Sequence, residues 1–426
     1  MDCSEWKVEN GEWWSVVEQR SLRIETTASR EAMSGYSGTE SMNMHIEPFQ
    51  VSVGQEILDD LQERLERTRW PDEVEQAGWR YGANLGYMKE LADYWRTKFD
   101  WRAQEQRINS FANFRAGVDD LHIHFIHERG KGPGPIPLLM THGWPSSFVE
   151  MLKIIPLLTD PAHHGGDASD SFDLIVPSVP GYGFSDRPSQ AGMTRWRVAE
   201  LWAKLMDGLG YQKFGLQAND IGAVISGWLA LDHPERVIGL HTMMPTFPPP
   251  SFDETQPPMT EVEKAFQAAV TAWDREEGGY DAIQATRPQT LNYGLNDSPV
   301  GLMAWIVEKW RAWTDPEGNI EDYFSKDDLL TNVMIYWVTQ TANSAARSYY
   351  ERAHDRRSLK PDDKIRVPTG VALTTEAVQR APREWVQRRY ADMRRWTEFS
   401  SGGHFLAAEN PEMLAVEIRE FFRQFR

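Results

Sequence analysis

One aspartate stands in a pattern that could make its side chain a nucleophile. Asp220 lies in the run ANDIGA, residues 218–223, with a small residue two positions before it and another two positions after it. This pattern is typical of a sharp strand-to-helix turn that lifts a nucleophile out of a sheet, beside backbone N–H groups. A carboxylate at such a turn predicts displacement at a saturated carbon, as in the opening of an epoxide or the cleavage of a carbon–halogen bond. Taken alone, the motif also fits an aspartate that caps the following helix.

A histidine near the C-terminus could serve as the general base. His404 lies in the run SGGHF, residues 401–405, on a loop that precedes a helical stretch rich in Glu and Leu. The order Asp220, then an acid, then His404 is the chain order of the α/β-hydrolase fold. Alternating apolar strands and helices in residues 132–245 indicate the parallel sheet that this fold requires.

The third member of this triad should follow the strand that we predict at residues 365–373. Glu376 is the first carboxylate after that strand. Glu384 and Asp392 are alternatives, and both lie in a segment beyond Pro382 that we expect to be helical and to face water. We therefore take Glu376 as the acid that orients the imidazole.

A loop before the nucleophile supplies candidate donors for a developing oxyanion. The run THGWP, residues 141–145, follows directly after an apolar strand predicted at residues 136–140. Its Gly and Pro shape the loop so that the Trp144 N–H can point at the oxyanion, and the Ile221 N–H beside the nucleophile is the second donor. We expect His142 to pack within the loop rather than to act as a second base.

Together these motifs resemble those of the epoxide hydrolases of the microsomal and fungal type. The resemblance extends from about residue 44 to the end of the chain, which is far more than a single motif match. It implies an α/β-hydrolase fold with a mostly parallel central sheet, a helical lid insertion and an N-terminal helical extension. The stretches that carry it are HGWP (142–145), GYGFS (181–185), the turn at Asp220 and GGHF (402–405) in the core, GGYDAIQ (278–284) and DSPVG (297–301) in the lid, and IEPF (46–49) and TRWP (68–71) in the extension.

The resemblance also implies a role for each candidate side chain. The family's nucleophile, base and acid fall on the triad described above. Two lid tyrosines that hold the epoxide oxygen are matched by Tyr280 and by Tyr349, which matches better than its neighbour Tyr350. The carboxylate would open the epoxide, and the histidine would then activate a water molecule that hydrolyses the ester. This chemistry requires no metal and no organic cofactor.

Two other functions fit parts of the pattern. A haloalkane dehalogenase uses the same fold and the same aspartate nucleophile, but it commonly has a tryptophan directly after the nucleophile, where this chain has Ile221. It also needs no tyrosine pair. A binding protein on a hydrolase fold that has lost its activity is the second alternative, because a fold alone does not imply a function. An intact nucleophile, base and oxyanion loop favour the enzyme.

The composition indicates an enzyme without charged macromolecular partners. The 426 residues carry a formal net charge of −18, which disfavours nucleic acid and anionic membranes as partners. No apolar run approaches the ~18 residues of a membrane span, and the first residues lack the features of a signal peptide. The single cysteine, Cys3, fits a reducing compartment. We expect a cytoplasmic enzyme that acts on a small apolar epoxide and water, and the resemblance implies a homodimer formed through the lid.

Changes in composition along the chain predict five parts. Residues 1–43 are polar and rich in Ser, Thr and Glu, and residues 44–131 form the N-terminal extension. The hydrolase core consists of residues 132–245 and residues 353–426. Residues 246–352 begin near a run of prolines, then become helical and aromatic, and form the lid between the two parts of the core.

Overall fold

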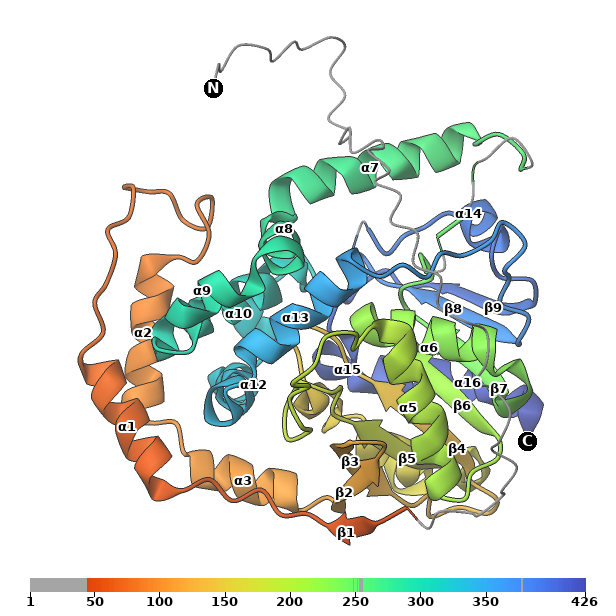
Figure 1. Ribbon diagram of the computed structural model, residues 1–426, viewed down its shortest axis with the longest axis horizontal. Coiled ribbons are helices and arrows are strands. Elements are labelled where there is room, and N and C mark those ends of the chain that lie inside the picture. Colours follow the sequence, from red (N-terminus) through yellow and green to blue (C-terminus); the bar gives the residue numbers. More distant parts are fainter. Residues whose placement is uncertain (1–43, 248, 251, 253–255, 377) are drawn as a thin grey trace, which may run out of the picture. The chain divides into compact units, whose positions relative to one another are not determined.

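A mostly parallel sheet lies at the centre of the structure (Figure 1). The computed structural model describes residues 44–426 except 248, 251, 253–255 and 377, so the predicted segment 1–43 lies outside the described residues. In the described residues the strand order is β1-β2-β3-β5-β4-β6-β7-β8-β9, antiparallel from β1 to β5 and parallel thereafter. The predicted fold class is confirmed. The strands are β1 Ile46–Pro48, β2 Asn113–Val118, β3 Leu121–Glu128, β4 Ile136–Thr141, β5 Phe172–Pro177, β6 Phe214–Ala218, β7 Val237–Thr242, β8 Thr369–Leu373 and β9 Met393–Glu398.

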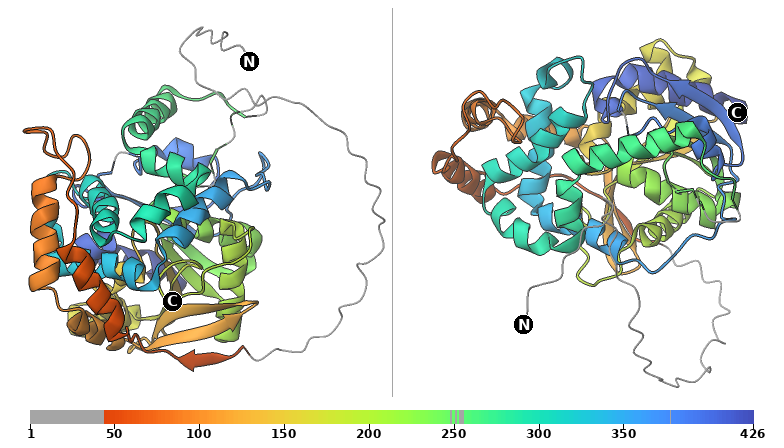
Figure 2. Two further views of the ribbon diagram at one scale, coloured as in Figure 1. Left: turned by 60° about the vertical axis from the view of Figure 1, so that its left-hand side comes forward. Right: turned by 90° about the horizontal axis from the view of Figure 1, so that it is seen from above.

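Helices cover both faces of this sheet (Figures 1 and 2). The helices α5 (Arg195–Gly208) and α6 (Asp220–Asp232) pack together on one face, and α4 (Ile155–Thr159) and α16 (Pro411–Phe422) pack together on the other. Every residue of β5 and β6 is buried and most are apolar, as is typical of parallel strands; Asp173 and Gln217 are the polar exceptions. Because these strands are buried, we expect the side chains that can contact a substrate to lie where the strands end.

A block of helices inserted between β7 and β8 covers the carboxyl ends of the parallel strands (Figure 1). Local signals set its helix boundaries: Thr260 and Glu263 form a capping box at the start of α7, and a proline begins α9 and α10. The helices α8 and α13 lie side by side. The helices of this lid are α7 Glu261–Glu277, α8 Gly279–Thr286, α9 Pro288–Leu295, α10 Pro299–Trp313, α11 Ile320–Tyr323, α12 Lys326–Thr339 and α13 Ala342–Ala353.

The segment before the parallel strands braces the lid from outside (Figure 2). It contains α1 (Gln55–Glu66), α2 (Leu85–Thr97) and α3 (Trp101–Asn109), and both α1 and α2 contact α10. Arg64 in α1 donates to the carbonyl oxygen and the carboxylate of Asp297, just before α10, at 2.7 and 2.8 Å. The same segment supplies β1, β2 and β3, so it contributes to the sheet as well as forming the helical extension that we predicted.

The strand predicted at residues 365–373 is shorter than expected. Regular pairing begins only after Pro368, which has no N–H to donate, and Ile365 forms an isolated bridge with Tyr390. None of the described helices has the length and apolar character needed to cross a membrane. The remaining short elements are η1 Phe148–Met151, η2 Pro161–His164, η3 Ala168–Asp170, η4 Pro234–Arg236, α14 Arg383–Gln387, α15 Leu406–Glu409 and η5 Arg423–Phe425.

Candidate active site

The turn predicted around Asp220 joins β6 to α6. Asp220 is the first residue of α6 and has a φ of 51°, which is uncommon for a residue with a side chain. Two glycines permit the close approach of the chain around it. A Cβ on Gly143 would lie 2.2 Å from Oδ1 of Asp220, and a Cβ on Gly222 would lie 2.0 Å from the carbonyl oxygen of Thr141. The glycine two positions after the aspartate is therefore required by packing against the neighbouring strand.

The structure brings His404 and Glu376 to Asp220 from two separate loops. Nδ1 of His404 is 2.8 Å from Oε2 of Glu376, and Nε2 of His404 is 3.7 Å from Oδ2 of Asp220. Glu376 lies just beyond β8, and His404 lies just before α15. The side chains of His404, Glu376 and Asp220 are 7%, 8% and 16% exposed. A histidine between an orienting acid and a nucleophile can act as a general base for a step at that nucleophile.

The charges around His404 favour its protonated form. Burial lowers the pKa of the imidazole, but the charge and hydrogen bond of Glu376 outweigh this effect, and with the charge of Asp220 they raise the pKa of His404 to about 9. If Asp220 were converted to an ester, its negative charge would disappear. One of the causes that raise the pKa of His404 would then be lost. The imidazole would then become a readier proton acceptor when water has to be activated.

The raised pKa of His404 predicts a loss of stability at alkaline pH. A histidine whose folded pKa lies above its unfolded value of about 6.5 contributes its full stabilisation below that pH, and loses it as the pH rises through about 9. Between pH 6 and pH 10, the wild type should therefore lose about 3 kcal/mol of unfolding free energy relative to His404→Gln. Urea unfolding of both proteins at several pH values measures this difference, and a constant difference across the range would contradict the prediction.

The two alternative acids lie away from the histidine. Glu384 is on α14 and accepts a hydrogen bond from Thr260. Asp392 lies outside that short helix, contrary to our prediction, and pairs with Arg394 at 2.8 Å. Of the three carboxylates considered, Glu376 is the one placed against the imidazole.

A polar network that the sequence did not reveal links the histidine loop to the nucleophile turn. Asn219 donates from Nδ2 to the carbonyl oxygen of His404 at 2.6 Å, and its Oδ1 accepts from Nε2 of Gln379 at 3.3 Å. Gln379 in turn accepts from the hydroxyl of Thr374 at 3.1 Å. The one signal in the sequence was Asn219 itself, a polar side chain directly before the nucleophile. The network fixes the spacing between two loops that are far apart in the chain.

The predicted oxyanion donors lie beside the nucleophile. The backbone N–H of Trp144 donates to Oδ1 of Asp220 at 2.9 Å. Ile221 is in the first turn of α6, where backbone N–H groups have no acceptor within the helix. His142 is buried, its Nε2 accepts from the Val179 N–H at 3.1 Å, and burial lowers its pKa to about 4. The neutral ring of His142 thus packs within the loop.

Two tyrosines from neighbouring lid helices face each other in the same region. Tyr280 in α8 and Tyr349 in α13 have ring centroids 5.9 Å apart, and the Trp144 ring stacks on Tyr280 at 4.8 Å. Burial raises the pKa of both phenols well above the usual range, and the charge of the nucleophile adds to the effect, so both can donate hydrogen bonds. Tyr350 is 36% exposed and stacks on His354. Of the two adjacent tyrosines, Tyr349 is the one that faces Tyr280.

The triad and the two facing tyrosines line one cavity of about 420 Å³ between the lid and the strand ends. Its size suits a small molecule. Besides the triad and the tyrosine pair, the wall contains apolar side chains and a few charged ones. The apolar residues include Met244, Phe266, Val270, Trp273, Trp313 and Trp385, and the charged ones are Arg195, Asp274, Asp281 and Arg352.

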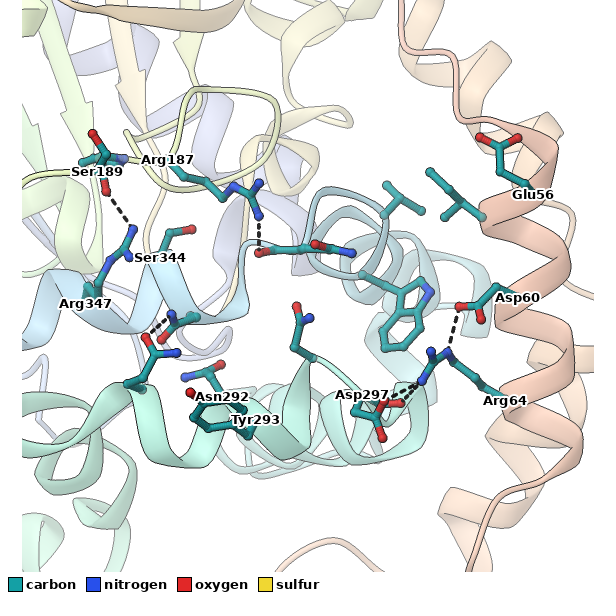
Figure 3. A pocket seen from close by; sticks show the side chains of 18 residues that line it. Glu56, Asp60, Arg64, Arg187, Ser189, Asn292, Tyr293, Asp297, Ser344 and Arg347 are labelled. Atoms are coloured by element: carbon teal, nitrogen blue, oxygen red, sulfur yellow. Dashed lines mark hydrogen bonds and ion pairs between the residues drawn. The ribbon is translucent and has the colours of Figure 1, made fainter.

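A larger groove of about 1000 Å³ lies elsewhere (Figure 3). Figure 3 shows Arg64, on α1, reaching Asp60 and Asp297, while Asn292 and Arg347 contribute polar groups to the wall. None of the candidate catalytic residues lines this groove. The smaller cavity is therefore the one that brings together the carboxylates, the imidazole and the two phenols that the sequence analysis singled out.

Two family models match the chain. The model described as "Epoxide hydrolase N terminus" matches residues 46–151, and the model described as "alpha/beta hydrolase fold" matches residues 136–280. The first spans α1, α2, α3 and the loop that contains Trp144, and the second spans the turn at Asp220. The two models together cover the chain from β1 into the lid.

Individual relatives extend the match over most of the chain. Epoxide hydrolase 1 of Oryctolagus cuniculus is 39% identical, over 88% of this chain and 88% of its own length. The crystal structure of juvenile hormone epoxide hydrolase from the silkworm Bombyx mori is 31% identical, with a TM-score of 0.78 over 90% of this chain and 94% of that chain. The epoxide hydrolase of Aspergillus niger is 26% identical, with a TM-score of 0.77 over 90% and 97%. Because the likeness spans nearly the full length of these proteins, the chain is a hydrolase that belongs to the epoxide hydrolase family of the α/β-hydrolase fold.

Proposed function

We propose that the protein adds water to an epoxide to give a vicinal diol, through a hydroxyalkyl ester on Asp220. The main support is that Asp220, His404 and the tyrosine pair line the same small cavity. A carboxylate nucleophile alone would serve several displacement reactions. Two buried phenols beside it supply the proton donors that an epoxide oxygen needs when its ring opens.

Ring opening is the first step. Oδ1 of Asp220 accepts the Trp144 N–H, so Oδ2 is the oxygen free to attack an epoxide carbon. The carbon–oxygen bond of the ring breaks as the new ester bond forms, and the epoxide oxygen accepts hydrogen bonds from Tyr280 and Tyr349. One phenol supplies the proton that converts this oxygen to a hydroxyl group. Asp220 then carries the substrate as a neutral ester.

Ester hydrolysis is the second step. His404, oriented by Glu376, takes a proton from a water molecule, whose oxygen attacks the carbonyl carbon of the ester. The negative charge develops on Oδ1, which already lies 2.9 Å from the Trp144 N–H, and the Ile221 N–H is the second donor. Collapse of this intermediate breaks the ester bond and releases the diol, whose leaving oxygen takes the proton held by His404. The second proton of the attacking water goes to the phenolate left by ring opening, so the carboxylate, the neutral imidazole and the phenol are all restored.

A single turnover in ¹⁸O-labelled water tests this route. With enzyme in excess over styrene oxide, the diol should be unlabelled and one ¹⁸O should appear in the peptide that contains Asp220, because water attacks the ester carbonyl. Label in the diol and none in the peptide would show direct attack of water on the epoxide. Release of bromide from a bromoalkane without hydrolysis of any epoxide would instead assign a dehalogenase.

The tyrosine pair yields a prediction of its own. Tyr280→Phe and Tyr349→Phe should each slow ring opening about 10- to 100-fold, and the double change by roughly 10³-fold or more, since one donor can partly replace the other. The rate of ester formation, measured by rapid quenching and mass spectrometry, reports this step. Tyr350→Phe is the matched control and should leave the rate near that of the wild type. Equal rates for the wild type and the double variant would show that the two rings only pack.

A further inference from the structure

One cation in this cavity forms no ion pair with any described residue. Arg195, the first residue of α5, lines the cavity with Asp220 and Tyr349. Within the part of the chain that the structure describes, its side chain makes no hydrogen bond and no ion pair, and its Nε is buried without a partner. Its guanidinium carbon lies 5.6 Å from the centre of the Tyr349 ring. The arginine thus stands beside the reacting groups with its donors unused.

The other cations near the tyrosines are neutralised. Arg352, whose guanidinium carbon is 5.5 Å from the Tyr349 ring, donates to both carboxylate oxygens of Asp281 at 2.8 Å. Lys309 lies 5.6 Å from the Tyr280 ring and pairs with two glutamates at 2.8 and 3.0 Å. Each of these cations therefore has a carboxylate partner, whereas Arg195 has none among the residues that the structure describes.

Asp220 does not serve as that partner. No ion pair joins Asp220 to Arg195, and the oxygens of Asp220 face the Trp144 N–H and the imidazole of His404. In the proposed reaction Asp220 also becomes a neutral ester. Arg195 would then be without a counter-charge for the lifetime of the covalent intermediate, unless the bound substrate itself supplied one.

An unpaired guanidinium in such a place is unfavourable. Removing a charge from water without giving it a partner destabilises a protein, and burial here lowers the pKa of Arg195 from its usual value. The guanidinium nevertheless stays protonated at any ordinary pH. Its planar set of donors matches the two oxygens of a carboxylate, which would remove the imbalance on binding.

We propose that Arg195 binds a carboxylate of the substrate, so that the preferred substrates are epoxy acids with an apolar body and a carboxylate next to the oxirane ring. This assignment rests on the proposed function. Since Tyr349 would donate to the epoxide oxygen, an anion held beside the Tyr349 ring must lie close to the oxirane. The apolar body fits the aromatic wall that includes Trp273 and Trp313. Repulsion by the acidic wall is reduced, because Asp281 is paired with Arg352.

A matched pair of substrates tests the proposal: 3-phenylglycidate and its uncharged analogue 3-phenylglycidamide. The wild type should show a kcat/KM about 10- to 100-fold higher for the acid, the range expected of a charge-assisted contact. Arg195→Gln should abolish most of this acid-to-amide ratio, and Arg195→Lys should retain part of it. Arg197→Gln is the control, because Arg197 lies in the same turn of α5 but pairs with Asp119 outside the cavity. Its ratio should equal that of the wild type.

The ratio of kcat/KM for the acid to kcat/KM for the amide is insensitive to partial unfolding, since both substrates are measured on the same protein sample. Equal kcat/KM values for acid and amide in a wild type that hydrolyses styrene oxide would overturn this inference and leave the proposed function intact. The same holds if Arg195→Gln keeps the wild-type ratio. If the wild type hydrolyses no epoxide and forms no ester on Asp220, the proposed function itself is wrong.

Discussion

Replacing Asp220 by alanine is expected to lower diol formation by roughly 10⁵-fold or more, because the covalent ester can no longer form. The tyrosines could still polarise an epoxide and His404 could still activate water, but neither replaces the carbon–oxygen bond made by the carboxylate. The variant should fold, since the side chain faces the cavity. Diol formation followed by chromatography, with circular dichroism and thermal unfolding of the same sample, checks both expectations.

The opposite end of the same helix offers a matched control. Asp232, the last residue of α6, pairs with Arg357 at 2.6 Å and does not line the cavity. Asp232→Ala removes the same chemical group from the same helix and should keep activity within a few-fold of the wild type. If Asp220→Ala turned over an epoxide at a rate close to that of Asp232→Ala, the covalent mechanism would be wrong.

Replacing His404 by alanine is expected to separate the two chemical steps. Asp220 and the tyrosines remain, so the variant should still open the epoxide, but without a base it should stall as the ester, with turnover reduced by at least about 10⁴-fold. Intact-protein mass spectrometry should show an added mass equal to one substrate molecule, and peptide mapping should place it on Asp220. A variant that gives neither adduct nor diol would contradict the two-step route.

Replacing the acid Glu376 should slow ester hydrolysis less severely than replacing His404. Glu376→Ala removes the carboxylate that holds the imidazole and stabilises its charged form, so the ester should accumulate and hydrolyse slowly. Glu384→Ala and Asp392→Ala are controls, because Glu384 bonds to Thr260 and Asp392 pairs with Arg394. If one of these variants stalled while Glu376→Ala behaved like the wild type, the acid would have to be reassigned.

The fold class and the nucleophile turn could be predicted from the sequence because their signals are local. A turn with a positive φ at Asp220 and a packed neighbour at Gly222 restricts residue types within a few positions, so a short pattern reveals it. The alternation of apolar strands with helices likewise reports on a sheet buried on both faces. The loop of His404 was found in the same way, from its neighbours and its place in the chain order.

Other features depended on contacts between distant segments, which no local pattern contains. Two adjacent tyrosines on one helix point in different directions, and only the packing of that helix decides which of them faces the cavity. Tyr349 faces Tyr280, whereas Tyr350 stacks on His354. Three carboxylates follow the same strand region, and only the packing of loops brings one of them to within 2.8 Å of the imidazole. Among the described residues Arg195 has no ion-pair partner, and this too depends on all the segments packed around it. By itself the sequence determined which side chains could react and where the chain must turn. Only the tertiary structure decided which of these side chains meet and which charges are left without a partner. The reason is that burial and pairing are set by residues far apart in the chain.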